Sequence, residues 1–244
     1  MVRSMQESEN INLLSTPIHV AFIMDGNRRF AKRLMKHPWK GHEWGAKKVR
    51  EVARWCRDKG IKYATFYGLS IENLYNRPKK ELEMLMRIFK REFSSIPYDK
   101  EIHRNEVKVN VIGRIDLLPP DVQEAINEAV ESTKHYDNYV VTFAIAYGGR
   151  QEIVDAVKKL VEKGNGIVDK LTPESFSRFL YTSNIPDPDL VIRTSGEKRI
   201  SGFLLWQIAY SELFFTEELW PEFKKETFEK AINDFMARER RFGR

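Results

Sequence analysis

The chain has 244 residues, of which 42% are hydrophobic and 31% are charged, so it is long enough to bury a sizeable core under a well-solvated surface. Lysine and arginine outnumber aspartate and glutamate by 41 to 35, giving a net charge of +6, which favours an anionic partner but also fits ordinary solubility. Cys56 is the only cysteine, which excludes an internal disulfide and a cysteine-based metal site and predicts a cytoplasmic protein.

From residue 18 onward, short apolar runs alternate with longer amphipathic segments. In chain order, the predicted elements are a strand (Ile18–Met24), a helix (Glu43–Lys59), a strand (Ile61–Tyr67), a helix (Lys79–Phe93), a strand (Val107–Ile112), a helix (Pro120–His135), a strand (Tyr139–Ala146), a helix (Arg150–Lys163), a helix from the N-cap Thr172 to Tyr181, a strand (Leu190–Arg193), a further candidate strand (Phe203–Trp206) and a helix (Glu226–Phe242). This alternation indicates a single α/β domain with a mainly parallel central sheet flanked by helices.

The segment before these elements, residues 1–17, is predicted to be a flexible N-terminal arm, because it is polar and has no apolar stretch of signal-peptide length. The sequence contains no run of roughly 18 apolar residues, the length that would suggest a membrane-spanning helix. Contact with a membrane surface stays open.

A first polar cluster, Asp25 to Phe30, directly follows the first predicted strand. Gly26 lets the backbone approach a ligand closely, and Arg28 and Arg29 supply charge-assisted hydrogen-bond donors. Asp25 is suited to hold Mg²⁺, which commonly bridges a carboxylate to substrate phosphates. Taken alone, the same residues also fit a strand-terminating turn with solvated arginines.

Two more polar clusters follow predicted strands, at Ser70–Pro78 and Arg193–Ser201. The second of these carries two arginines, a lysine and three hydroxyls, a donor set that suits a diphosphate. Each cluster alone also fits an exposed polar loop. Ligands of parallel sheets bind beyond the carboxyl ends of the strands, so three such clusters together favour a phosphate-binding site.

Six stretches of the sequence match one family pattern in order and spacing. They are His19–Lys32, Gly41-His42, Ser70–Asn73 with Arg77-Pro78, Tyr147–Arg150, Asp189–Trp220 and Arg238–Gly243. Together they resemble the undecaprenyl diphosphate synthase family of cis-prenyltransferases. The resemblance runs from about residue 18 to residue 243.

This resemblance implies a Mg²⁺-dependent transferase that condenses an allylic prenyl diphosphate with isopentenyl diphosphate to give a Z-configured polyprenyl diphosphate. It implies a non-Rossmann catalytic domain over residues 18–244 with a hydrophobic tunnel beside the sheet. It further implies a homodimer, and peripheral contact of this cytoplasmic protein with the membrane for product release stays open.

The resemblance also implies roles for individual residues. Asp25 is the implied catalytic Mg²⁺ ligand and Glu212 a second metal-associated carboxylate. Asn73 is implied to help remove the proton after condensation, by orientation or relay, because an amide is a poor base. The implied substrate-binding residues are Gly26, Asn27, Arg28, Arg29, Phe30, His42 and Arg77 for the allylic diphosphate, Arg193, Arg199 and Ser201 for isopentenyl diphosphate, and Ser70 and Glu72 beside them.

The predicted helix Lys79–Phe93 has a wider apolar arc than a single core-facing stripe needs. Its apolar residues are Leu82, Met84, Leu85, Met86, Ile88, Phe89 and Phe93. One side of the arc is predicted to line the tunnel, with complete packing in the core as the alternative.

Arg28, Phe30 and Pro38 differ from the residues of many bacterial members, so the sequence is closer to archaeal or eukaryotic branches of the family. These differences leave open the donor, the acceptor and the chain length, including a single or atypical condensation. A non-catalytic partner subunit is a further alternative, against which Asp25 and the arginines weigh. No glycine-rich nucleotide-binding motif follows a strand, and no recognised nucleic-acid-binding motif is present, so nucleic acid is not a predicted partner.

Overall fold

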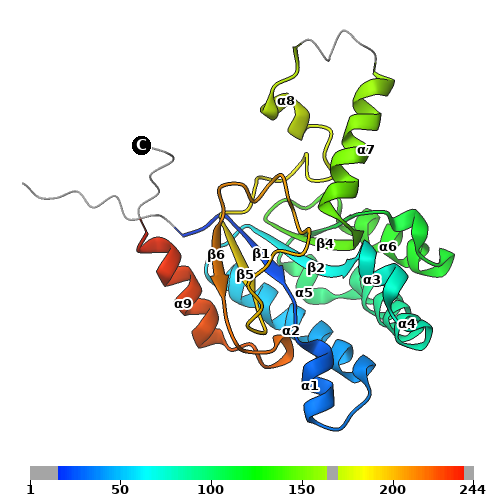
Figure 1. The fold of residues 1–244 in the computed structure, drawn as a ribbon, viewed down its shortest axis with the longest axis vertical. Helices are drawn as coiled ribbons and strands as arrows, with labels where there is room; N and C mark the ends of the chain where they lie inside the picture. Colours follow the sequence, from blue (N-terminus) through cyan, green and yellow to red (C-terminus); the bar gives the residue numbers. More distant parts are fainter. Residues whose placement is uncertain (1–15, 164–169, 239–244) are drawn as a thin grey trace, which may run out of the picture.

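A parallel β-sheet forms the centre of the computed structural model, which describes residues 16–163 and 170–238 (Figure 1). Its six strands lie in the order β3-β4-β2-β1-β5-β6, and all neighbouring pairs are parallel. The strands are β1 (His19–Ile23), β2 (Tyr63–Ser70), β3 (Val107–Ile112), β4 (Tyr139–Tyr147), β5 (Leu190–Arg193) and β6 (Glu212–Phe215). The predicted α/β class is confirmed, and the strand order differs from the Rossmann order.

Helices cover both faces of this sheet. They are α1 (Asn27–Arg33), α2 (Pro38–Asp58), α3 (Ile71–Asn76), α4 (Lys79–Ser95), α5 (Lys100–Arg104), α6 (Pro120–Thr133), α7 (Gly149–Glu162), α8 (Pro173–Ser177) and α9 (Lys225–Met236), with short 3₁₀ turns η1 (Ile96–Tyr98), η2 (Ile115–Leu117) and η4 (Trp220–Glu222). Helix α2 begins before the predicted Glu43 because Pro38 occupies its first turn, where proline is favoured.

The prediction of a strand at Phe203–Trp206 is wrong. The segment is a series of turns, and Ser201, Gly202 and Leu204 have positive φ angles of 49°, 74° and 44°, which a strand does not accommodate. Phe203 and Leu204 are apolar because they are fully buried against the sheet. The missed strand is β6, at the edge of the sheet.

Two helix ends also differ from the prediction. Thr172 is the N-cap as expected, and its hydroxyl accepts a hydrogen bond from the Ser175 N–H at 3.2 Å. The helix that follows ends at Ser177 rather than Tyr181. The final predicted helix is α9, and its predicted last residues, 239–242, lie outside the described residues, as does most of the predicted arm 1–17.

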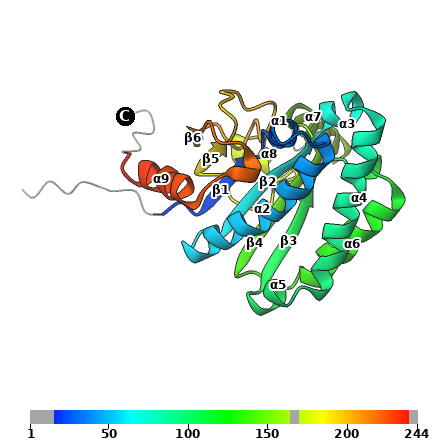
Figure 2. The same cartoon turned by 90° about the horizontal axis from the view of Figure 1, so that it is seen from below.

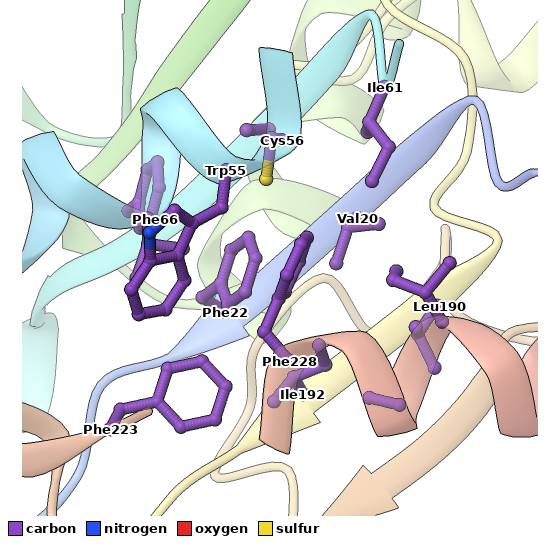
Figure 3. Packing of buried hydrophobic residues seen from close by; sticks show 14 of the residues in the cluster. Val20, Phe22, Trp55, Cys56, Ile61, Phe66, Leu190, Ile192, Phe223 and Phe228 are labelled. Atoms are coloured by element: carbon purple, nitrogen blue, oxygen red, sulfur yellow. The ribbon is translucent and has the colours of Figure 1, made fainter. Parts of the chain in front are cut away.

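Strand β1 is buried on both faces. Val20 and Phe22 point into a core formed with α2 and α9, where Phe22 stacks on Phe66 at 5.0 Å between ring centres (Figure 3). Ala21 and Ile23 pack on the opposite face against Phe203 and Leu204. Such continuous apolar strands are typical of parallel sheets covered on both sides.

The core on the α2 side also contains Cys56, which is 2% exposed (Figure 3). Burial raises the pKa of the Cys56 thiol far above its ordinary value, because a thiolate is poorly solvated in apolar surroundings.

The segments that follow β1 and β5 turn to opposite faces of the sheet. After β1 it forms α1 and α2, which pack on the same face as α9. After β5 it forms the turns around Phe203, which pack on the other face. Since β1 and β5 are neighbours, their carboxyl ends flank a topological switch point, the usual location of a ligand crevice in such sheets.

None of the helices in the described ranges combines the length and the apolar character that crossing a bilayer would require.

Replacing Phe22 with alanine is expected to lower the free energy of unfolding by about 3–5 kcal/mol, because it removes a fully buried ring from the core. Urea denaturation followed by circular dichroism measures the change. Tyr98→Ala is the control, since Tyr98 is 77% exposed, and its stability should stay close to that of the wild type. Equal effects of the two substitutions would contradict this packing.

Candidate active site

Asp25 lies just beyond the carboxyl end of β1, beside the last residue of β5. Its backbone is fixed there by Thr194, whose hydroxyl accepts from the Asp25 N–H at 3.1 Å and donates to the Asp25 carbonyl at 2.7 Å. The Trp220 N–H donates to the same carbonyl at 3.0 Å. The carboxylate is therefore held at the switch point while about a third of the side chain (32%) stays exposed.

Arg193, the last residue of β5, is the cation that faces Asp25. Its side chain is only 4% exposed, and Nη2 donates to Asp25 Oδ2 at 2.8 Å. Nη1 donates to Ser201 Oγ at 3.0 Å and to the Arg199 carbonyl. Its Nε has no partner within the described residues. The structure thus brings together three residues of the predicted clamp, Arg193, Arg199 and Ser201.

These contacts set the charge state of Asp25. Burial raises the pKa of the Asp25 carboxyl, but the hydrogen bond and charge of Arg193, aided by Ser195 and Arg29, outweigh burial and bring the pKa below its ordinary value of 3.8. Asp25 is therefore an anion at neutral pH, as a metal ligand must be.

Gly26 and Asn27 form the turn from Asp25 into α1. Gly26 has a φ of 105°, and a Cβ there would lie 2.9 Å from Cδ2 of Leu219, so glycine is required on both counts. The Asn27 amide donates to the Met24 carbonyl at 3.1 Å. Its buried Oδ1 accepts no hydrogen bond from the described residues and lies against Gly45 of α2, where a Cβ would come within 2.3 Å of it.

Arg29 connects α1 to the loop after β5. Its guanidinium donates to the Ser195 carbonyl at 3.1 Å and to the Ser195 hydroxyl, and it lies 3.6 Å from Asp25 and 3.9 Å from Glu197. Arg199 pairs with the same Glu197 and is mostly exposed. Ser195 and Gly196 have positive φ angles of 81° and 78°. Glycine adopts such an angle freely, but for Ser195 it is strained, and strain of this kind clusters where ligands are held.

A second charged group is formed by Arg77, which follows α3, Arg28 of α1 and His42 of α2, around Glu81 of α4. Arg77 Nη1 is 2.8 Å from His42 Nε2 and 3.1 Å from Glu81 Oε1, and Arg28 Nε is 3.5 Å from Glu81 Oε2. Burial lowers the pKa of His42, and its hydrogen bond to Glu81 offsets this effect only in part. Arg77 also experiences the charge of Asp25, so the two groups share one electrostatic site.

The sequence analysis missed Glu81, the carboxylate that gathers these cations. Its side chain is 5% exposed, and its pKa is lowered, first by the hydrogen bond from His42 and then, against the effect of burial, by Arg77 and Arg28. The available signal was its position four residues after Arg77, the spacing at which opposite charges meet on a helix.

Four predicted residues have less direct connections to the crevice. Ser70 caps α3 by accepting from the Asn73 N–H at 3.1 Å, and Glu72 and Asn73 are exposed on that helix. Phe30 packs edge-on against Trp44 at 5.4 Å. No contact among the described residues joins these four side chains to Asp25, and their roles stay predictions.

Glu212, the second predicted metal ligand, lies at the other end of the sheet. It is the first residue of β6 and stands opposite Leu190, whereas Phe215 stands opposite Arg193. Its carboxylate pairs with Arg238. Within one chain, Glu212 therefore does not share a site with Asp25.

An apolar cavity of about 210 Å³ lies between α2, α4 and the sheet. Figure 2 shows α2 and α4 on this face of the sheet. Met24, Asn27 and His42 line one end, and Val107 and Tyr139 line the other, so the cavity follows the strands from their carboxyl to their amino ends. Its walls include Ala46, Val49 and Ala53 of α2 and Leu85, Ile88, Phe89 and Phe93 of α4.

One side of α4 thus lines an apolar cavity, as predicted. Leu82 and Met86 are on the other side of the helix, next to Leu118, which lies just before α6. Met86 therefore does not face the cavity.

Arginines thus gather beyond the carboxyl ends of β1 and β5, and one of them, Arg77, contacts His42 at the end of an apolar cavity. This arrangement suits an anionic head group joined to an apolar chain. The comparisons with known proteins agree. Residues 23–243 match the family model described as "Putative undecaprenyl diphosphate synthase", and the chain belongs to this family of cis-prenyltransferases.

Among its relatives is the tritrans,polycis-undecaprenyl-diphosphate synthase (geranylgeranyl-diphosphate specific) of Pyrococcus abyssi, which is 52% identical over 93% of this chain and 87% of that protein. The protein of the same name from Methanocaldococcus jannaschii is 52% identical over 97% of this chain and 86% of its own length. The crystal structure of lavandulyl diphosphate synthase from Lavandula x intermedia, in complex with dimethylallyl diphosphate, has a TM-score of 0.86 at 32% identity and covers 94% of this chain and 99% of that one.

The predicted family, the fold and the reaction class, a cis-prenyltransferase enzyme, are therefore confirmed. The archaeal origin of these two relatives agrees with the branch that the sequence predicted. The residue roles inferred from the resemblance remain predictions, which the site geometry supports to different degrees.

The lowered pKa of Asp25 predicts a pH dependence of stability. A carboxyl whose pKa falls on folding stabilises the folded state above its unfolded pKa, and this contribution is lost as the pH falls through the folded value. The difference in unfolding free energy between the wild type and Asp25→Asn should therefore be larger at pH 7 than below the ordinary pKa of 3.8. Urea denaturation across this range measures it, and a difference that does not vary with pH would contradict the ion pair with Arg193.

Proposed function

We propose that this enzyme extends geranylgeranyl diphosphate by successive cis additions of isopentenyl units. The observation that carries the proposal is that His42 both contacts Arg77 at 2.8 Å and lines the apolar cavity. An allylic diphosphate has the matching shape, with an anionic head and an apolar tail. The names of the archaeal relatives at 52% identity support geranylgeranyl diphosphate as the donor.

The two cationic groups suit the two diphosphates. Arg77, His42 and Arg29, with the turn at Gly26, would bind the diphosphate of the allylic donor, whose tail then enters the cavity. Arg193, Arg199 and Ser201 would bind that of isopentenyl diphosphate. Holding both substrates in one crevice aligns the allylic carbon with the acceptor double bond.

Mg²⁺ is the proposed cofactor, and Asp25 fits it. The Asp25 carboxylate, about a third exposed and ionised at neutral pH, is an oxygen ligand of the kind that Mg²⁺ prefers. No group of three or more His, Cys, Asp or Glu side chains in the described ranges could hold a metal alone, which suits an ion that takes its other ligands from substrate phosphates and water. Bound Mg²⁺ would stabilise the negative charge of the departing diphosphate.

During condensation, the allylic C–O bond breaks, a C–C bond forms to isopentenyl diphosphate, and a proton leaves the new chain. The arginines stabilise the diphosphate that departs. Asn73 is the proposed residue that orients the group accepting the proton, consistent with its exposed position on α3 after the Ser70 cap.

We also propose a homodimer, which would reconcile the positions of Asp25 and Glu212. One chain separates these two carboxylates along the sheet, so Glu212 would serve the site of a second copy. The apolar residues Val154, Val157 and Val161 of α7 are 51%, 45% and 62% exposed, and exposed apolar surface of this kind marks protein interfaces.

The cytoplasm is the proposed location, because the single cysteine fits a reducing compartment. The turn after α1 is the proposed place of peripheral membrane contact. Met35 is 93% exposed and Leu34 is 44% exposed, and Lys32 and Lys36 flank them, a combination that favours an anionic lipid surface.

A product assay tests the proposed function. The protein is incubated with Mg²⁺, labelled isopentenyl diphosphate and, in separate reactions, dimethylallyl, geranyl, farnesyl or geranylgeranyl diphosphate. Chromatography should show polyprenyl diphosphate formed fastest with geranylgeranyl diphosphate. Absence of product with every primer would contradict the function, and a faster reaction with a shorter primer would overturn the proposed donor.

Asp25→Ala should lower the turnover rate by about 10²–10³-fold or more, because it removes the proposed metal ligand and leaves Arg193 unpaired. Chelation of Mg²⁺ with EDTA should abolish turnover in the wild type. Asp121→Ala is the matched control, since this carboxylate pairs with Lys90 on the surface at 3.0 Å, and it should keep wild-type activity. Full activity of Asp25→Ala would refute the role of Asp25.

A further inference from the structure

The segment that carries Ser201 is held in a strained shape. Residues 201–210 form consecutive turns rather than a helix or a strand, and Ser201 and Leu204 have positive φ angles of 49° and 44°. Such angles are unfavourable for residues other than glycine and persist only where the surrounding structure enforces them. Contacts from outside this segment, called the Ser201 turn below, therefore set its shape.

Tyr67 of β2 contacts the Ser201 turn at its first residue. The Tyr67 hydroxyl lies 3.4 Å from the Ser201 carbonyl and 3.2 Å from the Tyr147 carbonyl, and it donates to both. The Tyr67 ring stacks on Phe203 with 4.6 Å between ring centres and 15° between the ring planes. Burial raises the pKa of the Tyr67 hydroxyl, and the charge of Glu72 raises it further, so the hydroxyl remains a donor at neutral pH.

The start of α7 holds the next residue of the turn. The Gly149 N–H donates to the Gly202 carbonyl at 2.8 Å, and a Cβ on Gly149 would lie 2.7 Å from the same carbonyl oxygen. The Ser201 turn therefore rests directly on the backbone of α7, and its place depends on how the first turn of that helix is anchored.

Glu152, in the first turn of α7, provides this anchor. It is fully buried. One of its carboxyl oxygens accepts from the Tyr147 hydroxyl and from Gln207 Nε2, the latter at 3.0 Å, and the other accepts from the Tyr181 N–H at 2.9 Å. Gln207 belongs to the Ser201 turn and also donates to the Thr182 hydroxyl at 2.8 Å. Glu152 thus joins the end of β4, the start of α7 and the far part of the turn.

We infer that Tyr67 and Glu152 are positioning residues for the isopentenyl diphosphate site and act through the Ser201 turn. The inference rests on the proposed function, in which Arg193, Arg199 and Ser201 bind that diphosphate. Ser201 is exposed and its Oγ accepts from Arg193 Nη1 at 3.0 Å, so a turn fixed against the sheet keeps its hydroxyl beside the guanidinium. A displacement of less than about 1 Å is enough to weaken binding at such a site.

The hydrogen bonds of Tyr67 and Glu152 lead to only one of the two proposed diphosphate sites. Those of the donor site, between Arg77, His42 and Glu81, connect α2 to α4 instead. Loss of positioning should therefore weaken the binding of isopentenyl diphosphate and leave that of the allylic donor nearly unchanged. A general loss of stability would affect the two substrates alike.

Tyr67→Phe removes the hydroxyl and keeps the stacked ring. The KM for isopentenyl diphosphate should rise about 3- to 10-fold, as expected for one lost hydrogen bond, while the KM for geranylgeranyl diphosphate stays within about twofold. The matched control is Tyr136→Phe, which removes a hydroxyl that lies 3.0 Å from His103 Nδ1 and should leave both KM values unchanged. Initial rates of label incorporation, with each substrate varied in turn, give the constants.

Glu152→Gln tests the anchor independently of Tyr67. An amide accepts through one oxygen only, so its NH₂ group faces a donor on one side. The KM for isopentenyl diphosphate should again rise about 3- to 10-fold, with the KM for the donor nearly unchanged. The control is Thr133→Val, which removes a buried hydroxyl that donates to the Ala129 carbonyl and accepts from the Val109 N–H, and it should lower stability without raising either KM.

Combination with Ser201→Ala tests the route of the effect. If Tyr67 acts through Ser201, adding Tyr67→Phe to Ser201→Ala should raise the KM for isopentenyl diphosphate by less than about twofold, because residues that act through one another are not additive. Circular dichroism verifies that each variant is folded.

Three results would overturn the inference and leave the proposed function standing. They are an unchanged KM for isopentenyl diphosphate in folded Tyr67→Phe or Glu152→Gln, an equal rise in both KM values, and an undiminished effect of Tyr67→Phe in the Ser201→Ala background. Absence of product in the wild type would overturn the proposed function and the inference with it.

Discussion

The buried guanidinium of Arg193 is the constraint on which the site depends. A charge removed from water is costly unless hydrogen-bonded partners surround it, and Arg193 at 4% exposure finds them in Asp25, Ser201 and the Arg199 carbonyl. Satisfying this cation fixes the ends of β1 and β5 and holds the loop after β5 against Arg193. The same contacts that make the buried charge tolerable thus place the carboxylate and hydroxyl that the reaction is proposed to use.

Carboxylates of the protein itself pair with the arginines around Asp25 and His42. Asp25 pairs with Arg193, Glu197 with Arg199, and Glu81 with Arg77. An incoming diphosphate therefore exchanges one set of anionic partners for another, so its affinity reflects a difference between two paired states. The cavity wall beside His42 adds apolar contacts that only a substrate with a hydrocarbon tail can use, and this favours prenyl diphosphates over free phosphate.

Local sequence predicted those parts of the fold that local interactions decide. The strands Val107–Ile112 and Leu190–Arg193 have the predicted bounds, because each apolar run ends at turn-forming or charged residues. Phe203–Trp206 has the composition of a strand, but it forms turns with positive φ angles. Its apolar side chains are buried because they pack on strands that are distant in the sequence. Glu81 gains its role only when α4 brings it to His42, and the position of Glu212 follows from the register of β5 and β6. Relations of this kind are set by tertiary packing, which motif spacing does not contain.

The burial of Cys56 has a practical consequence for labelling. It is the sole thiol of the chain and is 2% exposed with a raised pKa, so alkylating reagents, which attack thiolates, react with it slowly while the protein is folded. A cysteine introduced at an exposed position would therefore be modified selectively without first removing the native one. Fluorophores or spin labels placed in this way on α2 and α5 would report the distance between these helices during catalysis, and slow labelling of Cys56 itself would report global unfolding.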